Sequence, residues 1–460
     1  MRKFFFVFLL CSGQAFAAPP STGTVTPVGW VNGTRYMKCD GVTDDTTGLQ
    51  NAVNDAANGT LMLPKGICNI SATIVITSTI HIIGAGGGSN QLFAGTTLEW
   101  VGASTTTPMI DLQGVRDASF QDFLIETTSA NPLAIGIQST TISGKQSGKD
   151  QFYRIFMNGT STGLGKGYAF VVGSGGDNNN DQATFIDNII ANYTIAGWSF
   201  EGGESQNHKM INCSFLGWNA GHATLPNQYG VTTILGASNG GNFAWIGGYG
   251  CCNGGADFFL GAPRNTISIE NADFESSDRF LVTTGSTGNA WPILIEATRW
   301  AGNALDSDGI AINYGLAGTL TLIGNLIGDA GVTDSAALQI GLASGATHIA
   351  AVAIGNWVNT SLANPFTQLF GNTTGVWTLL GNKVGYPTIT QPLNTLMSNQ
   401  QAVTIANLPA CNIGSVGAHA SVSNGQTSPP FNGAVSTTGA VYAPVGCVQT
   451  GASSYGWVYQ

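Results

Sequence analysis

The sequence predicts an all-β protein in which many short strands coil into a long solenoid, and three observations support this fold class. Apolar residues make up 43% of the chain and charged residues only 9%, as expected for inward-facing strand residues joined by small polar turns. Short apolar-rich segments recur from Phe120 onward at irregular intervals of 23–36 residues. Residues 67–390 contain no sustained helical stripe, so helices are not expected between the strands.

The N-terminus has the pattern of a secretory signal peptide. Arg2 and Lys3 precede an apolar run from Phe4 to Leu10, and Ala15-Phe16-Ala17 forms a small-residue cleavage site. We therefore expect cleavage after Ala17 and a mature chain that is secreted, periplasmic or at the cell surface. No other apolar run approaches the roughly 18 residues of a membrane span. Residues 18–38 are expected to form an extended leader.

The stretch from residue 39 to residue 66 predicts a helix followed by a short strand. The side chain of Thr43, Asp44 or Asp45 can accept a hydrogen bond from the first free N–H groups of a helix. The apolar residues that follow have helical spacing: Leu49, Ala52, Val53 and Ala56. Asn58-Gly59 ends this pattern, and an apolar segment over residues 60–63 reads as a strand.

This stretch carries a family resemblance. Its pattern DGxTDDTxxxQxAxxxAxxG, followed by LPxG, resembles the entry segment of the pectate lyase superfamily, in the rhamnogalacturonase and epimerase-like group. The resemblance implies a single-stranded right-handed parallel β-helix over residues 39–387, with residues 39–66 as its N-terminal cap. It also implies a polysaccharide as the partner.

The repeats indicate three short strands per turn of the solenoid, with one turn position that can be aligned from repeat to repeat. The aligned residues are Asp122, Arg154, Asp187, Asn212, Gly248, Asn271, Ala297, Asn325, Asn356 and Asn382. Asparagine at such a turn tolerates a left-handed backbone and can stack its amide on the equivalent residue of the next turn. We therefore interpret these asparagines as structural.

The C-terminal part changes in composition. Residues 388–404 are a polar linker, and residues 405–460 read as a small β module rich in proline and glycine. The module resembles those of phage tail-fibre-like secreted proteins. It could supply a second cap or an oligomer contact, for which a homotrimer is the arrangement that we consider.

The cysteines predict disulfides, because an exported chain meets an oxidising compartment. Cys39 and Cys68 flank the cap and are expected to pair, as are Cys411 and Cys447 around the C-terminal module. A bridge from Cys213 to Cys251 or Cys252 would leave one thiol over. The spacing of cysteine and histidine matches no zinc pattern, so we expect no metal bound by these residues.

The strongest candidate site combines two acidic segments one repeat apart. Glu270 and Glu296 are 26 residues apart, as are Asp273 and Arg299, and Phe274 and Trp300, so each pair should stack on adjacent turns. We predict Asp273, Glu275, Glu296 and Arg299 as catalytic, with Glu270, Phe274 and Trp300 binding substrate. The alternative is that Asp273 and Arg299 form a surface ion pair without function, and that Phe274 and Trp300 stack inside the core.

A second cluster contains Trp198, Glu201 and Glu204, which we predict to bind substrate, with His208 and Lys209 nearby. A third segment, residues 177–181, reads as a solvated loop or a weak calcium site. Calcium is the one cofactor that the sequence leaves open.

The expected function is cleavage of a polysaccharide by a lyase or a glycoside hydrolase. A net charge of −10 argues against nucleic acid as a partner and favours a weakly charged or neutral glycan. The catalytic NTD, GHG and RIK motifs of related polygalacturonases are missing, and Asp44-Asp45 does not match their DD motif, because it lies at the predicted helix start and not on a strand turn. The alternative is therefore a non-catalytic surface, adhesion or glycan-binding spike protein, related to phage tailspikes.

Overall fold

The computed structural model describes residues 29–86, 95–102, 104–160, 163–173, 179–202, 204–217, 225–233, 241–261, 266–283, 292–301, 312–313, 318–327, 349–358, 375–380, 383–384, 419–425, 441–451 and 454–459. The predicted signal peptide, most of the leader, the 388–404 linker and Cys411 lie outside these residues.

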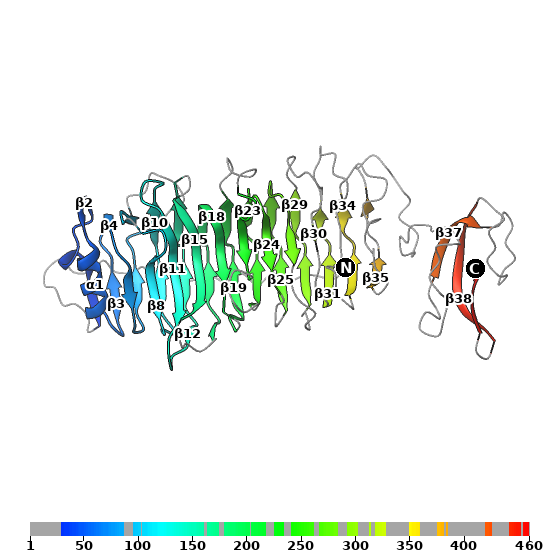
Figure 1. The fold of residues 1–460 in the computed structure, drawn as a ribbon, viewed down its shortest axis with the longest axis horizontal. Coiled ribbons are helices and arrows are strands. Elements are labelled where there is room, and N and C mark those ends of the chain that lie inside the picture. Colours follow the sequence, from blue (N-terminus) through cyan, green and yellow to red (C-terminus); the bar gives the residue numbers. More distant parts are fainter. Residues whose placement is uncertain are drawn as a thin grey trace, which may run out of the picture.

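The chain coils into a parallel β-helix whose successive turns stack along one axis (Figure 1). Each full turn adds one strand to each of three parallel ladders. Ladder 1 is the 13-stranded sheet of β1 (Trp30–Asn32), β3 (Thr60–Met62), β6 (His81–Ile83), β9 (Ser119–Gln121), β13 (Gln151–Tyr153), β17 (Thr184–Ile186), β19 (His208–Ile211), β22 (Phe243–Ile246), β25 (Ile267–Glu270), β28 (Ile293–Glu296), β31 (Gly318–Ile323), β33 (Ile349–Ile354) and β35 (Gly375–Leu380).

Ladders 2 and 3 join into one 21-stranded sheet, because the long strand β18 (Ile189–Phe200) belongs to both. Ladder 2 contains β2 (Asp40–Asp44), β4 (Gly66–Ile70), β7 (Thr96–Trp100), β10 (Phe123–Thr127), β14 (Phe156–Gly159), β20 (Ser214–Gly217), β23 (Tyr249–Cys251), β26 (Asp273–Glu275), β29 (Arg299–Ala301), β32 (Leu326–Ile327), β34 (Trp357–Val358) and β36 (Lys383–Val384). Ladder 3 contains β5 (Ile74–Ile76), β8 (Pro108–Gln113), β11 (Leu133–Thr141), β15 (Leu164–Val172), β21 (Tyr229–Thr232), β24 (Ala256–Leu260), β27 (Leu281–Thr283) and β30 (Ile312–Asn313).

Seven smaller elements lie outside the ladders. A 3-10 turn, η1 (Gly33–Arg35), precedes the β-helix, and β12 (Ser147–Gly148) pairs with β16 (Asn180–Asp181). The C-terminal module is an antiparallel sheet of β37 (His419–Gly425), β38 (Val441–Gly451) and β39 (Ser454–Tyr459). The helix α1 (Thr46–Asp55) lies at the N-terminal end of the ladders. In the described part of the chain, no helix has the length and apolarity that a membrane span requires.

Helix α1 forms where the sequence predicts a helix. Asp44 Oδ1 accepts a hydrogen bond from the N–H of Thr46 at 3.0 Å, and Leu49, Ala52 and Val53 are buried. Gln50 attaches the helix to β5, since its side chain both donates to and accepts from the backbone of Val75 at 2.9 Å. That the helix acts as a cap for the core stays a prediction.

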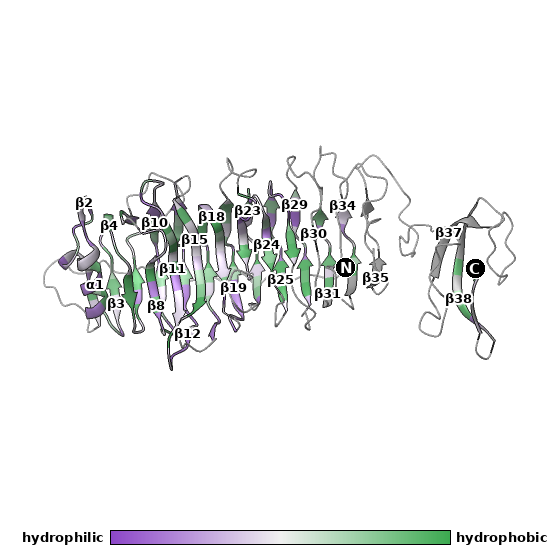
Figure 2. Cartoon of the chain, viewed as in Figure 1, coloured by the Kyte–Doolittle hydropathy of each residue, from purple (hydrophilic) through white to green (hydrophobic). Residues whose placement is uncertain are grey.

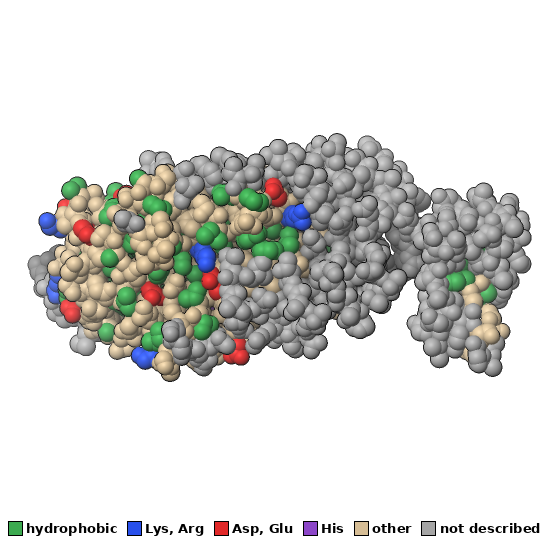
Figure 3. All heavy atoms as spheres, viewed as in Figure 1, with side chains coloured by type: hydrophobic (Ala, Val, Ile, Leu, Met, Phe, Trp, Pro, Cys, Tyr) green, Lys and Arg blue, Asp and Glu red, His purple; other side chains and the backbone are tan. Residues whose placement is uncertain are grey.

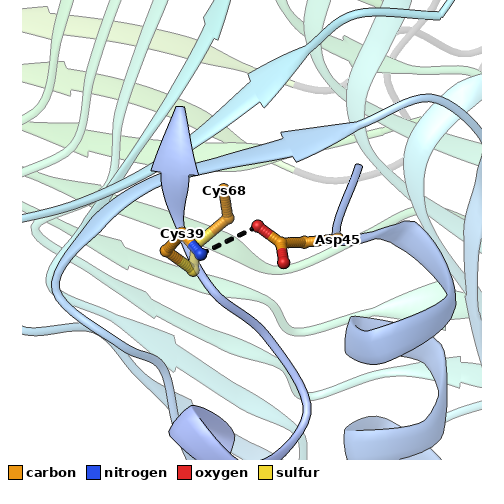
Figure 4. Close-up of side chains that lie close together, drawn as sticks. All are labelled: Cys39, Asp45 and Cys68. Atoms are coloured by element: carbon orange, nitrogen blue, oxygen red, sulfur yellow. Dashed lines mark hydrogen bonds between the residues drawn. A yellow bond between two sulfur atoms is a disulfide. The ribbon is translucent and has the colours of Figure 1, made fainter. Parts of the chain in front are cut away.

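The aspartate next to the helix, Asp45, holds the chain at the predicted Cys39–Cys68 disulfide, which the structure contains. Its buried carboxylate accepts hydrogen bonds from the backbone N–H of Lys38 at 2.8 Å and from that of Cys39 at 2.9 Å. Figure 4 shows the second of these bonds. Asp45 is therefore a structural residue.

The sequence left the partners of Cys213, Cys251 and Cys252 open. Cys251 and Cys252 bond to each other, and Cys213 is a buried free thiol. Cys213 lies at a turn into β20, whereas the adjacent pair lies at the end of β23. Cys447 is disulfide-bonded, but its predicted partner is outside the described residues.

Buried apolar residues form one core cluster between the ladders, and hydrophobic positions recur along the strands of successive turns (Figure 2). Rings at equivalent positions stack from turn to turn: the ring centroids of Phe120 and Phe152 are 5.4 Å apart, and those of Phe152 and Phe185 are 5.0 Å apart. The surface in Figure 3 shows few charged side chains over the described residues, as the composition predicts.

From β9 to β33, the chain bends between ladders 1 and 2 at a residue with positive φ that directly follows the ladder 1 strand. The aligned turn residues Asp122, Arg154, Asp187, Asn212, Asn271 and Ala297 have φ between 48° and 63°. At three turns the alignment is wrong by one residue, since the bend residue that follows the ladder 1 strand is Gly247, Gly324 or Gly355. At each of these turns a glycine takes the bend position, and glycine adopts positive φ without the steric cost of a side chain. At the first of them Gly248 also has a positive φ, of 81°.

The residue after each bend points inward, which explains the asparagines. Asn325 and Asn356 are each 2% exposed, and the amide of Asn325 donates to Asn356 Oδ1 at 2.9 Å. Asn188 occupies the same place in an earlier turn. It accepts from the N–H of Ile155 and donates to the carbonyl of Phe152. These amides satisfy backbone groups in the turns, so their predicted structural role is confirmed.

We expect Asn188→Ala to lower the free energy of unfolding by about 3 kcal/mol or more, because it leaves several buried backbone groups unpaired. Chemical denaturation measures this loss. Gln151→Ala, at an exposed position of β13, is the control and should change stability by less than about 0.5 kcal/mol. Equal effects of the two substitutions would contradict the structural role of Asn188.

A carboxyl group is also buried in the core. Asp257 of β24 is fully buried, and its Oδ1 accepts hydrogen bonds from Ser277 at 2.5 Å and from Asn253 at 3.0 Å. Burial is the main cause that raises the pKa of Asp257 to about 7. The unfolded chain releases this proton near pH 4, so the folded state holds more protons between about pH 4 and about pH 7.

Stability should therefore fall as pH rises through this window and level off above about pH 7, with a contribution from Asp257 of up to about 4 kcal/mol. Asp257→Asn should gain stability relative to the wild type over the same window. The measurement is the difference in unfolding free energy between the two proteins from pH 4 to pH 8. A constant difference would overturn the assignment.

Candidate functional site

The structure divides the acidic cluster at residues 270–300 between two faces of the β-helix. Glu270 and Glu296 are in register on adjacent strands of ladder 1, as predicted. Asp273 and Arg299 are in register on ladder 2. The bend at Asn271, with φ 53°, separates these pairs. Glu296 is therefore on a different face from the other three residues predicted to be catalytic.

Four side chains on ladder 2 form what we call the Arg299 cluster: Tyr249, Asp273, Glu275 and Arg299. Arg299 Nη1 lies 2.6 Å from Asp273 Oδ1 and 3.8 Å from Glu275 Oε2. The hydroxyl of Tyr249 donates a hydrogen bond to Glu275 Oε1. Two carboxylates, two residues apart on β26, thus converge on one guanidinium and have a phenol beside them.

The Arg299 cluster is open to solvent. The side chains of Asp273, Arg299 and Glu275 are 49%, 44% and 41% exposed, so a ligand can reach all three. Partial burial, followed by the hydrogen bond to Glu275, raises the pKa of Tyr249 well above its usual range. Tyr249 therefore keeps its proton at neutral pH and is a donor in the cluster.

Phe274 and Trp300 are not positioned to bind substrate. They are in register as predicted, but they are 0% and 4% exposed and belong to the core. The reason is the alternation of side chains along a strand. Because Asp273 and Glu275 point outward, Phe274 between them points inward, where its ring packs on Phe215 at 5.7 Å.

Two aromatic residues of this face were missed by the sequence analysis. Tyr249 is in register with Asp273, and Trp357 follows Arg299 two turns later through Leu326. Both side chains are partly exposed. The signal that could have found them is the spacing from the bend, because each residue is two positions after a bend glycine, at Gly247 and Gly355.

The second predicted cluster is also divided. Trp198 is fully buried and packs against Tyr168 and Trp245, so its predicted contact with substrate is wrong. Glu201 lies outside the core. Its Oε1 is 2.5 Å from Lys166 Nζ and accepts a hydrogen bond from Ser199 at 2.6 Å. The sequence analysis missed Lys166, which is 35 residues before Glu201.

Glu204 and His208, in the same segment, differ in exposure. Glu204 is exposed. His208 is buried and stacks on Phe200, with ring centroids 4.3 Å apart. Burial lowers the pKa of His208 to about 3, so this side chain is neutral and structural.

The Arg299 cluster does not fit calcium. A guanidinium already lies between its two carboxylates, where a cation would have to bind. Among the described residues, one group of three metal-ligating side chains lies close enough to share an ion: Cys39, Asp45 and Cys68. There the two sulfurs form a disulfide and the carboxylate binds backbone N–H groups. Part of the third predicted segment, including Asp177, lies outside the described residues.

Solved structures with the same fold show that the architecture is the predicted right-handed parallel β-helix. The chain is similar to the A-module of the Azotobacter vinelandii mannuronan C-5 epimerase AlgE6, with 16% identity and a TM-score of 0.53 over 78% of this chain and 100% of that one. It is also similar to the tailspike gp49 of Acinetobacter baumannii bacteriophage Fri1, a capsular polysaccharide depolymerase, with 13% identity and a TM-score of 0.51 over 94% and 79%.

A third similar structure is the Agl-KA catalytic domain, with 13% identity and a TM-score of 0.50 over 81% of this chain and 67% of that one. At the level of sequence, no protein-family model and no curated protein matches the chain. At these identities the matches establish the fold and leave the site to be argued from its own residues.

Arg299→Met should lower the free energy of unfolding by less than about 1 kcal/mol, because the ion pair that it removes is exposed. Lys166→Met should cost more, since it leaves Glu201, whose side chain is 14% exposed, without its counter-charge. Denaturation of both variants tests this. A larger loss for Arg299→Met would show that the Arg299 cluster is structural.

Proposed function

We propose that this protein is an exported enzyme that cleaves a weakly charged or neutral polysaccharide, and that the Arg299 cluster is its active site. The observation that carries the proposal is the convergence of two exposed carboxylates, Asp273 and Glu275, on one guanidinium. The fold supports it, since a mannuronan epimerase and a capsular polysaccharide depolymerase share this β-helix.

Hydrolysis of a glycosidic bond needs one carboxyl group as acid and another as base. Residues two apart on a strand have Cα atoms about 6.6 Å apart, and inverting enzymes hold their two carboxyl groups roughly 6.5–9.5 Å apart. In our scheme Glu275, held by Tyr249, gives its proton to the glycosidic oxygen as that bond breaks. Asp273 takes a proton from the water that forms the new bond to the anomeric carbon. Arg299 keeps the two side chains in place.

Elimination is the other reaction that these residues could perform. A lyase removes the proton next to a uronic carboxylate and returns a proton to the leaving oxygen. Arg299 would neutralise the carboxylate, and Glu275 and Tyr249 would be the base and the acid. The products distinguish the two reactions, because hydrolysis gives reducing ends and elimination also gives an unsaturated sugar.

The second candidate is a glycan-binding spike without catalysis, supported by the missing catalytic motifs of related polygalacturonases. It would use the same face, where Tyr249 and Trp357 border the charged residues. The predicted signal peptide, which implies secretion or display at the cell surface, the homotrimer and the absence of a nucleic-acid partner are parts of the same proposal.

The experiment is a screen of the mature chain against neutral and uronic polysaccharides, with detection of reducing ends and of unsaturated products. On any substrate that is cleaved, Asp273→Asn and Glu275→Gln should each lower kcat by about 100-fold or more. Hydrolysis should invert the configuration at the anomeric carbon. Glu270→Gln, across the bend on ladder 1, is the matched control and should keep its activity.

Retention of activity in both Asp273→Asn and Glu275→Gln would reject the Arg299 cluster as the active site. Saturable glycan binding without any product would instead favour the spike. Light scattering of the same sample reports whether the chain is a monomer or a trimer.

A further inference from the structure

Another pair of acidic residues meets on ladder 2, far along the chain from the Arg299 cluster. Glu99 of β7 and Glu126 of β10 are in register on adjacent strands. Both side chains point outward, because their neighbours Leu98 and Ile125 are buried in the core. Adjacent strands are about 4.8 Å apart, so the two carboxylates face each other across one turn.

Among the described residues, no positively charged side chain pairs with these two carboxylates. In the part of the chain that the structure describes, neither Glu99 nor Glu126 takes part in a salt bridge. The single hydrogen bond to either carboxylate is a long one, from the amide of Asn158 to Glu126 at 3.4 Å. The proximity of Glu126 adds to burial in raising the pKa of Glu99. Like charges directly opposite each other on adjacent strands are destabilising.

The next position of the same column holds an unpartnered oxygen. Asn69 of β4 is in register with Glu99, and it points outward because Cys68 and Ile70 on either side are buried. Asn69 is only 8% exposed, and its Oδ1 atom is buried without a hydrogen-bond partner. A buried acceptor without a donor lowers the stability of the fold. This unpartnered oxygen is an observation independent of the carboxylate pair.

We propose that Asn69, Glu99 and Glu126 form a calcium-binding site on ladder 2. All donors are oxygen atoms, as a hard divalent cation prefers, and one amide with two carboxylates leaves positions that water can fill. A bound cation would offset the repulsion between the carboxylates and would give Asn69 Oδ1 a partner. The site is structural in this proposal and is separate from the Arg299 cluster, so it does not depend on the proposed enzymatic function.

Two amides on the following turns make hydrogen bonds toward Glu126. Asn192 donates to Asn158 Oδ1 at 2.8 Å, and Asn158 in turn donates to Glu126 Oε1. Among the described residues, the other oxygen of Glu126 and both oxygens of Glu99 accept no hydrogen bond and are available to a cation.

The test is a titration of the EDTA-treated full mature chain with calcium chloride, followed by calorimetry and by the thermal unfolding midpoint. We expect one saturable site with a Kd of about 0.1–1 mM, as for other extracellular calcium modules, and a Tm that rises with the same midpoint. Glu99→Gln combined with Glu126→Gln should abolish both responses. It should also raise the Tm in EDTA, because the repulsion is gone. Asn69→Leu should weaken binding at least several-fold.

Glu270→Gln combined with Glu296→Gln is the matched control, because this pair is equally in register but lies on ladder 1. It should bind calcium as the wild type does. The proposal is overturned if the wild type shows no saturable binding up to about 10 mM calcium, ten times above the expected range. It is equally overturned if the Glu99 and Glu126 double variant binds with unchanged Kd, which would place the ion elsewhere.

Discussion

The stacking of each turn on the previous one, about 4.8 Å away, is the constraint on which the rest of this structure depends. Every side chain lies over its counterpart one turn away, so the chain can use only residues that tolerate such a neighbour. Aromatic rings and amides do: Phe152 packs between Phe120 and Phe185, and Asn325 donates to Asn356. Charges tolerate it when their signs alternate, when water screens them or when an ion is bound between them.

This constraint makes the few charged residues informative. Arg154 over Asp122 and Arg299 over Asp273 are pairs of opposite sign, with their closest atoms 2.6 Å apart. Glu126 over Glu99, and Glu296 over Glu270, are pairs of like sign. The Glu270 and Glu296 pair is on an open face, where water screens the charges. The Glu99 and Glu126 pair has a buried, unpartnered amide oxygen next to it, and this difference distinguishes a solvated pair from a candidate ion site.

The bend between ladders 1 and 2 decides which residues can work together. One residue in a left-handed conformation redirects the chain, so that Glu270 and Asp273 face different directions although only three positions separate them. The same bend brings Tyr249, Asp273 and Arg299 into one outward column on three successive turns. Chemistry on this fold therefore comes from residues one turn apart much more readily than from neighbours in the sequence.

Much of this could be predicted from the sequence. The helix at residues 46–55, the Cys39–Cys68 disulfide and the register of Asp273 with Arg299 all follow from local patterns or from the repeat length. The errors at the turns have one cause. Where a glycine precedes the expected turn residue, as at Gly247 and Gly355, the bend moves by one position. The outward positions of Tyr249 and Trp357 are therefore not apparent from the spacing of the repeats.

By itself, the sequence determined the period of the solenoid and the residues that stack on one another, because both depend on spacing along the chain. Only the tertiary structure decided whether each side chain points into the core or into solvent. Phe274 and Trp300 match in register as expected, yet they lie in the core, while Asp273 and Glu275 lie in solvent. The physical reason is that side chains along a strand point alternately inward and outward, and that this alternation starts anew after each bend. The direction of a side chain therefore depends on the backbone angle at the bend, which the repeat length does not specify.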